Sequence, residues 1–286
     1  MMSPTDRTIA VLGATGRQGG QVVRHLLADG WSVRALTRTP DGAKATELKR
    51  LGAQVIRADL DDEASLDTAF ADTHGLYSVL LPHSGSIDIE IRQGRNAASA
   101  AARAGVEHVV YGSAGLDAEK RGIEQWDAKI EIAQAFRERG LPLTVLRPMA
   151  FMELMTDPAY FPQSSTWYTM PKLLGEDYPV AWLSVQDLGA IAAKAFAHPE
   201  RFAGRDLNLV ADVRSIAECR EIYREVRGRK PPRLPMPLFL FRRFVGDDLL
   251  TMWRWLHDHP LDADPAETRR ILPEAMDVRT WLRGTA

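Results

Sequence analysis

The chain has 286 residues, of which 45% are hydrophobic and 26% charged, and its formal net charge at pH 7 is −2. This length and apolar content suffice for one large core or for a domain with an added lobe. The balanced charge excludes a general attraction to nucleic acid or to an anionic membrane, and the single cysteine, Cys219, excludes an intramolecular disulfide framework. The residues before Arg7 lack an apolar signal core, and no segment approaches the roughly 18 apolar residues of a membrane helix, so we expect a cytoplasmic protein.

Residues 8–37 combine an apolar strand, a glycine-rich turn, a helix and a second strand. The turn, residues 13–20, reads Gly-Ala-Thr-Gly-Arg-Gln-Gly-Gly. Glycines here permit a tight turn and a close approach of the backbone to a pyrophosphate, which the N–H groups of the following helix would face. The pattern predicts a dinucleotide-binding βαβ unit, and a glycine-rich turn without a ligand is the alternative. The predicted contacts are Gly13, Thr15, Gly16, Arg17, Gln18 and Gly19.

The end of the second strand bears on which dinucleotide binds. An acidic residue there would accept hydrogen bonds from a free ribose 2′-OH, but this chain has Thr37 and Arg38. Arg38, with help from Arg17 and Lys44, could pair with a 2′-phosphate, which favours NADP(H) as the cofactor. The alternative is a solvated turn residue before Pro40.

Strand and helix patterns continue to alternate, which predicts a doubly wound parallel sheet of the Rossmann type. Asp59 and Leu60 follow the third strand, and Leu80 and Leu81 end the fourth, so we expect them beside the cofactor. The remaining acids of residues 61–63 are typical of a helix start. The further strands are predicted at Ala53–Ala58, Leu76–Leu81, His108–Tyr111, Leu143–Leu146 and Asp206–Val210, and the helices at Ala43–Leu51, Ala64–Phe70, Asp88–Ala104, Ile123–Arg139 and Ser184–His198.

The composition changes after Pro148. Residues 149–180 are rich in methionine, proline and aromatic residues, which is typical either of a lid or pocket wall or of core packing for a smaller lobe. The remainder is mostly helical, with an amphipathic pattern at Ser215–Arg227 that includes Cys219 as a buried thiol. We therefore predict a Rossmann domain at 1–148 and a lid insert with a smaller C-terminal substrate or partner lobe at 149–286, with 181–210 returning to the first domain.

Several motifs together resemble the NmrA-like family, atypical members of the short-chain dehydrogenase superfamily. They are the glycine motif of 13–20, Leu-Thr-Arg-Thr-Pro at 36–40, His-Val-Val-Tyr at 108–111, Trp-Asp-Ala-Lys at 126–129, Leu-Arg-Pro at 146–148 and Val-Gln-Asp-Leu-Gly at 185–189. The resemblance extends from about residue 7 to about residue 280. It implies NADP(H) between a Rossmann domain and a small lobe, and either reductase activity or cofactor sensing with a regulatory protein partner.

Superfamily dehydrogenases use a Tyr-x-x-x-Lys pair for proton transfer. The lysine matches Lys129, but the tyrosine position holds Gln125, which cannot serve as that acid. Lys129 could contact cofactor hydroxyls, or it could be a solvent-facing helix lysine. A literal match at Tyr168 and Lys172 contains Pro171, which we expect to break the helix, so we interpret it as chance.

Other candidate catalytic residues are Ser113, which could polarise a substrate carbonyl, and His83, which could donate a proton. Ser113 could equally lie in a flexible turn, and His83 could simply be exposed. His257 and His259 do not share a helix face, so we predict no metal site.

Two functions remain open. The first is an NADP(H) sensor or regulator, favoured because Gln125 replaces the usual acid. The second is an NADPH-dependent reductase of a small apolar electrophile such as a quinone or an enone. We expect no direct contact with nucleic acid or membrane, and a homodimer is left open.

Overall fold

The computed structural model describes residues 7–80, 87–115, 119–157, 165–232, 235–259 and 263–285. The chain divides into two compact units. The first comprises Met1–Arg147 and Leu188–Asn208, and the second comprises Pro148–Asp187 and Leu209–Ala286. In this division the segment that returns to the first unit begins at Leu188, whereas the sequence placed its start at 181. Within the described part of the chain, every helix is too short or too polar to cross a bilayer.

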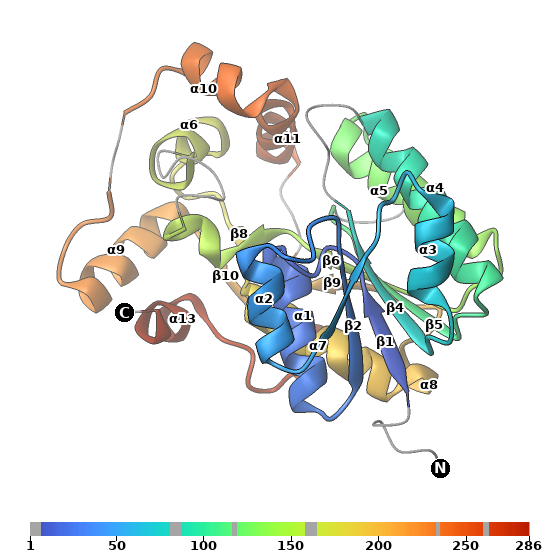
Figure 1. Cartoon of the computed structure of the whole chain (residues 1–286). Helices are drawn as coiled ribbons and strands as arrows, with labels where there is room; N and C mark the ends of the chain where they lie inside the picture. Colours follow the sequence, from blue (N-terminus) through green and yellow to red (C-terminus); the bar gives the residue numbers. More distant parts are fainter. Residues whose placement is uncertain are drawn as a thin grey trace. The chain divides into compact units, whose positions relative to one another are not determined.

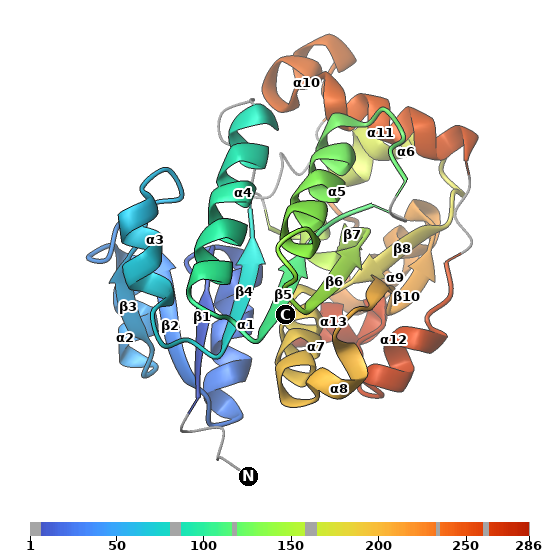
Figure 2. The same ribbon diagram turned by 90° about the vertical axis from the view of Figure 1, so that its right-hand side faces the viewer.

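The first unit contains a seven-stranded sheet with the strand order β3-β2-β1-β4-β5-β6-β9 (Figures 1 and 2). Neighbouring strands from β3 to β6 are parallel, and their order is that of the dinucleotide-binding doubly wound fold. The strands are β1 Thr8–Val11, β2 Ser32–Thr37, β3 Gln54–Arg57, β4 Gly75–Val79, β5 His108–Gly112, β6 Leu143–Pro148 and β9 Asp206–Leu209. The predicted fold class is confirmed.

Helices cover both faces of this sheet. Helices α3, α4 and α5 lie on one face, and α1, α2 and the first-unit part of α7 lie on the other (Figures 1 and 2). Each buries an apolar stripe, as α1 does with Val22, Val23 and Leu26. The helices are α1 Arg17–Ala28, α2 Ala43–Arg50, α3 Glu63–Phe70, α4 Ile87–Arg103, α5 Glu124–Arg137, α7 Val185–Ala197 and α8 Pro199–Phe202. The order of strands reverses between β1 and β4, where folds of this type bind ligands at the carboxyl ends of the strands.

The second unit is mostly helical, as predicted, but it also contains a three-stranded sheet in the order β10-β8-β7. Its strands, β7 Ala150–Phe151, β8 Val180–Leu183 and β10 Asp212–Arg214, are too short to show alternation in the sequence. The helices are a 3₁₀-helix at Met152–Met155, a π-helix at Ser165–Thr169, α6 Met170–Leu174, α9 Ile216–Arg227, α10 Leu238–Val245, α11 Asp247–Asp258, α12 Ala266–Ile271 and α13 Val278–Gly284.

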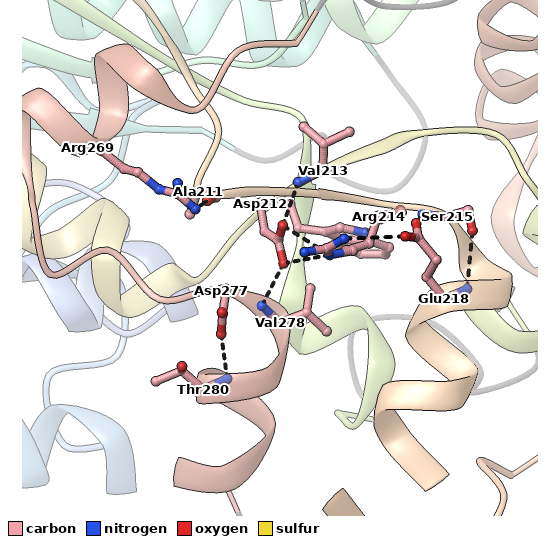
Figure 3. Close-up of polar contacts among 11 residues, drawn as sticks. Ala211, Asp212, Val213, Arg214, Ser215, Glu218, Arg269, Asp277, Val278 and Thr280 are labelled. Atoms are coloured by element: carbon pink, nitrogen blue, oxygen red, sulfur yellow. Dashed lines mark hydrogen bonds and ion pairs between the residues drawn. The ribbon is translucent and has the colours of Figure 1, made fainter. Parts of the chain in front are cut away.

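Polar contacts hold the C-terminal helices to this small sheet (Figure 3). The buried carboxylate of Asp212 accepts hydrogen bonds from the backbone N–H of Val213 at 2.9 Å and of Val278, at the start of α13, at 3.1 Å. Arg214 forms an ion pair with Asp212 and another with Glu218. Helix α9 begins with a capping box between Ser215 and Glu218. Residues far apart in the sequence are thus joined through one carboxylate.

Candidate functional site

The glycine loop lies between the end of β1 and the start of α1. Gly13 has φ +68°, a conformation that favours glycine, and a Cβ there would lie 2.8 Å from Val79 Cγ1 of β4. Gly16 donates a hydrogen bond from its N–H to the Gly13 carbonyl at 2.8 Å. A Cβ on Gly19 would overlap that same carbonyl oxygen. The loop therefore excludes a side chain at Gly13 and at Gly19, and a Cβ on Gly16 would crowd the Gly13 carbonyl oxygen at 3.1 Å.

The loop presents the N-terminus of α1. Gly16 is the N-cap, it is exposed, and no side chain caps the helix. The first turn contains no acidic residue, and Arg17 and Gln18 follow the cap directly. The N–H groups of a first helical turn and the positive end of the helix dipole make such an end favourable for a phosphate. Thr15, Gly16, Arg17 and Gln18 thus lie together around a cradle that fits the pyrophosphate of a dinucleotide.

Arg38 directly follows β2. Thr37 is buried, and its hydroxyl accepts a hydrogen bond from the Thr39 N–H at 3.2 Å, which fixes the turn. The Arg38 side chain is exposed, and among the described residues it has no hydrogen-bond or ion-pair partner. Its guanidinium can therefore receive a ligand phosphate without breaking a contact.

The acidic run after β3 starts helix α3. Asp62 is the N-cap and accepts a hydrogen bond from the Ser65 N–H, and Asp61 pairs with Arg92 and Gln93 of α4. The partly buried Asp59 accepts a hydrogen bond from the Asp61 N–H at 3.1 Å. The prediction that residues 61–63 belong to the helix start agrees with these contacts.

The next residue, Leu60, is partly buried like Asp59, and its carbonyl accepts a hydrogen bond from Asn96 Nδ2 at 2.9 Å. Contacts of Asp59 and Leu60 with a cofactor stay predictions.

Lys129 lies on α5 and is buried, so the interpretation as a solvent-facing helix lysine is wrong. Its ammonium donates a hydrogen bond to the carbonyl of Leu80, directly after β4, at 2.5 Å. It also forms an ion pair with the carboxylate of Glu90 of α4. The sequence analysis missed Glu90, because one acid among several on a helix carries no local signal of its partner.

Ser113 follows β5 and is buried. Its N–H donates to the Leu146 carbonyl at 2.8 Å, whereas its hydroxyl lies 3.4 Å from the Ala114 carbonyl, at the edge of hydrogen-bond distance. Gln125 stands one turn before Lys129 on α5. Two further predicted site residues, Leu81 and His83, lie outside the described residues.

The literal Tyr-x-x-x-Lys match lies in the second unit and is not broken by proline. Lys172 Nζ donates to the Tyr168 hydroxyl at 2.7 Å and lies 4.0 Å from the centre of its ring. Pro171 occupies the first turn of α6, where its missing N–H costs nothing, and the π-helix leads directly into that turn. The expectation that Pro171 breaks the helix between Tyr168 and Lys172 is therefore wrong.

The histidines at the end of α11 have local partners. His257 Nδ1 lies 2.7 Å from the Leu174 carbonyl, and His259 Nδ1 lies 2.8 Å from the Trp255 carbonyl. Within the described residues, no group of three or more His, Cys, Asp or Glu side chains is arranged to hold a metal ion.

The fold and the glycine cradle define a doubly wound α/β protein of the dinucleotide-binding class. The model of the NmrA-like family matches residues 5–282, so the chain belongs to the NmrA-like family.

Sequence relatives include the NmrA-like family domain-containing oxidoreductases FrzB of a Cladobotryum species and himF of Aspergillus japonicus. FrzB is 31% identical over 78% of this chain and 74% of its own length, and himF is 31% identical over 78% and 73%.

Solved structures share the fold over almost the whole chain. NmrA, described as a negative transcriptional regulator in complex with NADP, has a TM-score of 0.78 at 22% identity and covers 98% of this chain and 95% of its own. Citrobacter triphenylmethane reductase complexed with NADP(H) has a TM-score of 0.78 at 21% identity and covers 98% and 100%. The Escherichia coli quinone oxidoreductase QOR2 complexed with NADPH has a TM-score of 0.77 at 21% identity and covers 97% and 99%.

Proposed function

We propose that this protein is an NADPH-dependent reductase of a small, electron-poor substrate. The observation that carries the proposal is Lys129, whose buried ammonium is fixed at the carboxyl end of β4, next to the strand β1 that leads into the glycine cradle. This edge of the sheet is where doubly wound folds bind ligands. The Leu80 carbonyl and the Glu90 carboxylate hold this ammonium in place, as a contact with a bound cofactor would require.

The choice of NADP(H) rests on the cradle and on Arg38. The glycine loop and the α1 N-terminus would hold the pyrophosphate, and the exposed Arg38 would pair with the 2′-phosphate. NmrA, the Citrobacter reductase and QOR2 are each described with NADP or NADPH, although NmrA is also described with NAD. Arg38 is the feature of this chain that favours the phosphorylated form.

The bound cofactor would supply a hydride. Lys129 would donate a hydrogen bond to a cofactor ribose hydroxyl, and the buried Ser113 would offer its hydroxyl beyond β5 to a substrate oxygen. Gln125 cannot deliver a proton, so an acceptor that needs little acid assistance is favoured. Quinones and enones are of this kind.

The test is single-turnover oxidation of NADPH with the protein in excess, followed by absorbance against a panel of quinones, enones and aldehydes. We expect oxidation that requires the folded protein and slows at least tenfold in Lys129→Ala, since a positioned charged contact is worth roughly 1.5–3 kcal/mol. Lys120→Ala, on the surface, is the matched control and should retain the wild-type rate. Tight NADPH binding without oxidation across the panel would contradict the proposal.

A cofactor sensor is the second candidate, and one observation favours it: Gln125 stands where the superfamily places its acid. The solved NmrA is described as a regulator, whereas FrzB and himF are named oxidoreductases, and these two names support the reductase as the first candidate. A sensor must bind oxidised and reduced cofactor with different affinities or couple them differently to a protein partner. Equal affinities for NADP⁺ and NADPH, with and without a candidate partner, would exclude sensing of the redox state.

A further inference from the structure

The strongest unexplained feature of the first unit is a charge buried between two helices. Glu90 of α4 is completely buried, and its Oε1 pairs with the Lys129 ammonium of α5. Its second oxygen has no hydrogen-bond partner among the described residues. Burying a carboxylate is energetically costly, and an apolar pair of the same volume would often be as stable or more stable. Stability alone therefore does not account for Glu90.

The packing of α4 against α5 brings the pair together. Gly94 lies one turn after Glu90, and a Cβ there would come within 2.6 Å of Ile132, which lies nearly one turn after Lys129. Without a side chain at Gly94 the two helices approach closely enough for the carboxylate to reach the ammonium.

A buried phenol next to the pair shows how apolar these surroundings are. Tyr111 of β5 is buried, and its hydroxyl has no partner among the described residues. Burial raises the Tyr111 pKa, and the charge of Glu90 raises it further. Tyr111 therefore stays neutral, and Lys129 is the cation that the carboxylate faces.

The ammonium has three N–H donors, and the described residues use two of them, through Glu90 and the Leu80 carbonyl. Both acceptors are buried, Glu90 within α4 and Leu80 directly after β4, so their positions are fixed. Two fixed acceptors in turn fix the direction of the third N–H donor. Because Leu80 directly follows β4, the third donor lies at the edge of the sheet formed by the carboxyl ends of the strands, where the cofactor site is proposed.

We propose that Glu90 is a positioning residue of the cofactor site, which aims the Lys129 ammonium at the nicotinamide nucleotide and cancels its charge. The inference rests on the proposed function. Cancellation matters because the nicotinamide ring is cationic in NADP⁺ and neutral in NADPH. An unpaired ammonium nearby would repel only the oxidised ring.

The test compares the dissociation constants of NADP⁺ and NADPH for the full-length protein, by calorimetry and by NADPH fluorescence at pH 7. Glu90→Gln keeps the volume and an acceptor but removes the charge. We expect the NADP⁺ to NADPH ratio of dissociation constants to rise about five- to tenfold, as for an uncompensated charge a few ångströms away in a partly shielded site. Loss of packing alone would weaken both forms equally and leave the ratio unchanged.

Two further variants make the test decisive. In Glu90→Gln with Lys129→Met both charges are gone, so the ratio should return to the wild-type value while both forms bind more weakly. This variant leaves no buried unpaired charge, so if Glu90→Gln alone does not fold, a ratio in the double variant that differs from the wild-type value still contradicts charge cancellation. Glu131→Gln, the same substitution on α5 at a surface carboxylate that pairs with Lys120, should leave the ratio unchanged.

The outcomes separate the two proposals. A wild-type protein that binds neither form would overturn the proposed function and this inference with it. A wild-type protein that binds both forms, with the same ratio in wild type and Glu90→Gln, would overturn the role of Glu90 alone. A double variant whose ratio differs from the wild-type value would also contradict charge cancellation.

Discussion

The contacts that stabilise the inside of each unit differ between the two units of this protein. In the first, strands and helices alternate along the chain, and helices pack beside strands that flank them in the sequence, as α1 does with β1 and β2. In the second, residues far apart in the sequence are joined by side chains that accept backbone hydrogen bonds. The first unit can therefore be inferred from local patterns, whereas the second depends on single residues whose partners no local pattern reveals.

Three buried or largely buried carboxylates illustrate this in the second unit. Both oxygens of Glu153 accept the Val185 N–H, at 3.1 and 3.2 Å. Asp187 accepts the Met276 N–H at 3.0 Å, and Asp212 accepts that of Val278 (Figure 3). In the first unit the buried ion pair of Glu90 and Lys129 lies at the proposed ligand edge. Breaking the Glu90–Lys129 pair should therefore affect ligand binding as well as stability, whereas changing these three carboxylates should affect stability alone.

The largest effect is expected from Lys129→Met, which leaves the Glu90 carboxylate buried without its partner. Breaking a buried pair in this way costs about 3–5 kcal/mol of unfolding free energy. Urea denaturation followed by circular dichroism measures the loss. Lys120→Met removes an exposed ammonium that pairs with Glu131 of α5, and it should leave the denaturation midpoint near that of wild type. Equal losses of stability in the two variants would contradict the assignment.

The pH dependence of stability should have opposite signs in the two units. Burial, and secondarily His74, lowers the His108 pKa to about 4, so its stabilisation is present above pH 6.5 and is lost as the pH falls towards 4. Burial raises the Glu153 pKa to about 7, so stability is lost as the pH rises from about 4.5 to 7. Each loss amounts to about 3 kcal/mol.

Two variants separate these opposing trends. Relative to wild type, His108→Gln should become comparatively more stable towards acid, and Glu153→Gln comparatively more stable towards neutral pH. Denaturation midpoints from pH 4 to pH 8 would show this. Parallel curves for wild type and both variants would refute the assignment.

Asp212→Asn should destabilise the second unit by about 2 kcal/mol, because the amide offers an N–H group where the carboxylate accepted hydrogen bonds. Hydrogen exchange should quicken in α13 while NADPH affinity stays within twofold of wild type. Asp277→Asn is the control, because asparagine caps a helix as well as aspartate does, and Asp277 caps α13 through the Thr280 N–H. A tenfold loss of NADPH affinity in Asp212→Asn would contradict the view that Asp212 contributes to stability and not to ligand binding.

The smallest effect distinguishes two adjacent glycines of the first unit. Gly19→Ala would force its Cβ against the Gly13 carbonyl and should weaken NADPH binding by about tenfold, or about 1.4 kcal/mol. In Gly20→Ala the new Cβ lies 3.4 Å from the Ala14 carbonyl, an ordinary contact, so affinity should stay within twofold. Fluorescence titration measures both. Equal affinities in the two variants would show that the cradle is not the binding surface.

The sequence was sufficient for the sheet of the first unit because long, periodic elements and the glycine turn encode it locally. Gly13 and Gly19 could be assigned roles because only glycine fits where they lie. Glu90 could not be found, since its role depends on where α4 packs against α5. The prediction of a helix break at Pro171 was wrong for a related reason, because the effect of a proline depends on which turn of the helix it occupies. The three-stranded sheet of the second unit was not predicted, because its strands are too short to show the alternation of a β-strand.

The most direct test of the central claim, that the first unit binds NADP(H) in the glycine cradle with Arg38 on the 2′-phosphate, is a titration of wild type and Arg38→Glu with NADPH and NADH. Removing a guanidinium–phosphate pair and adding a repelling carboxylate should weaken NADPH binding by about 100-fold, with NADH binding changed by less than about threefold. Equal losses for both cofactors, or no loss for either, would contradict the claim.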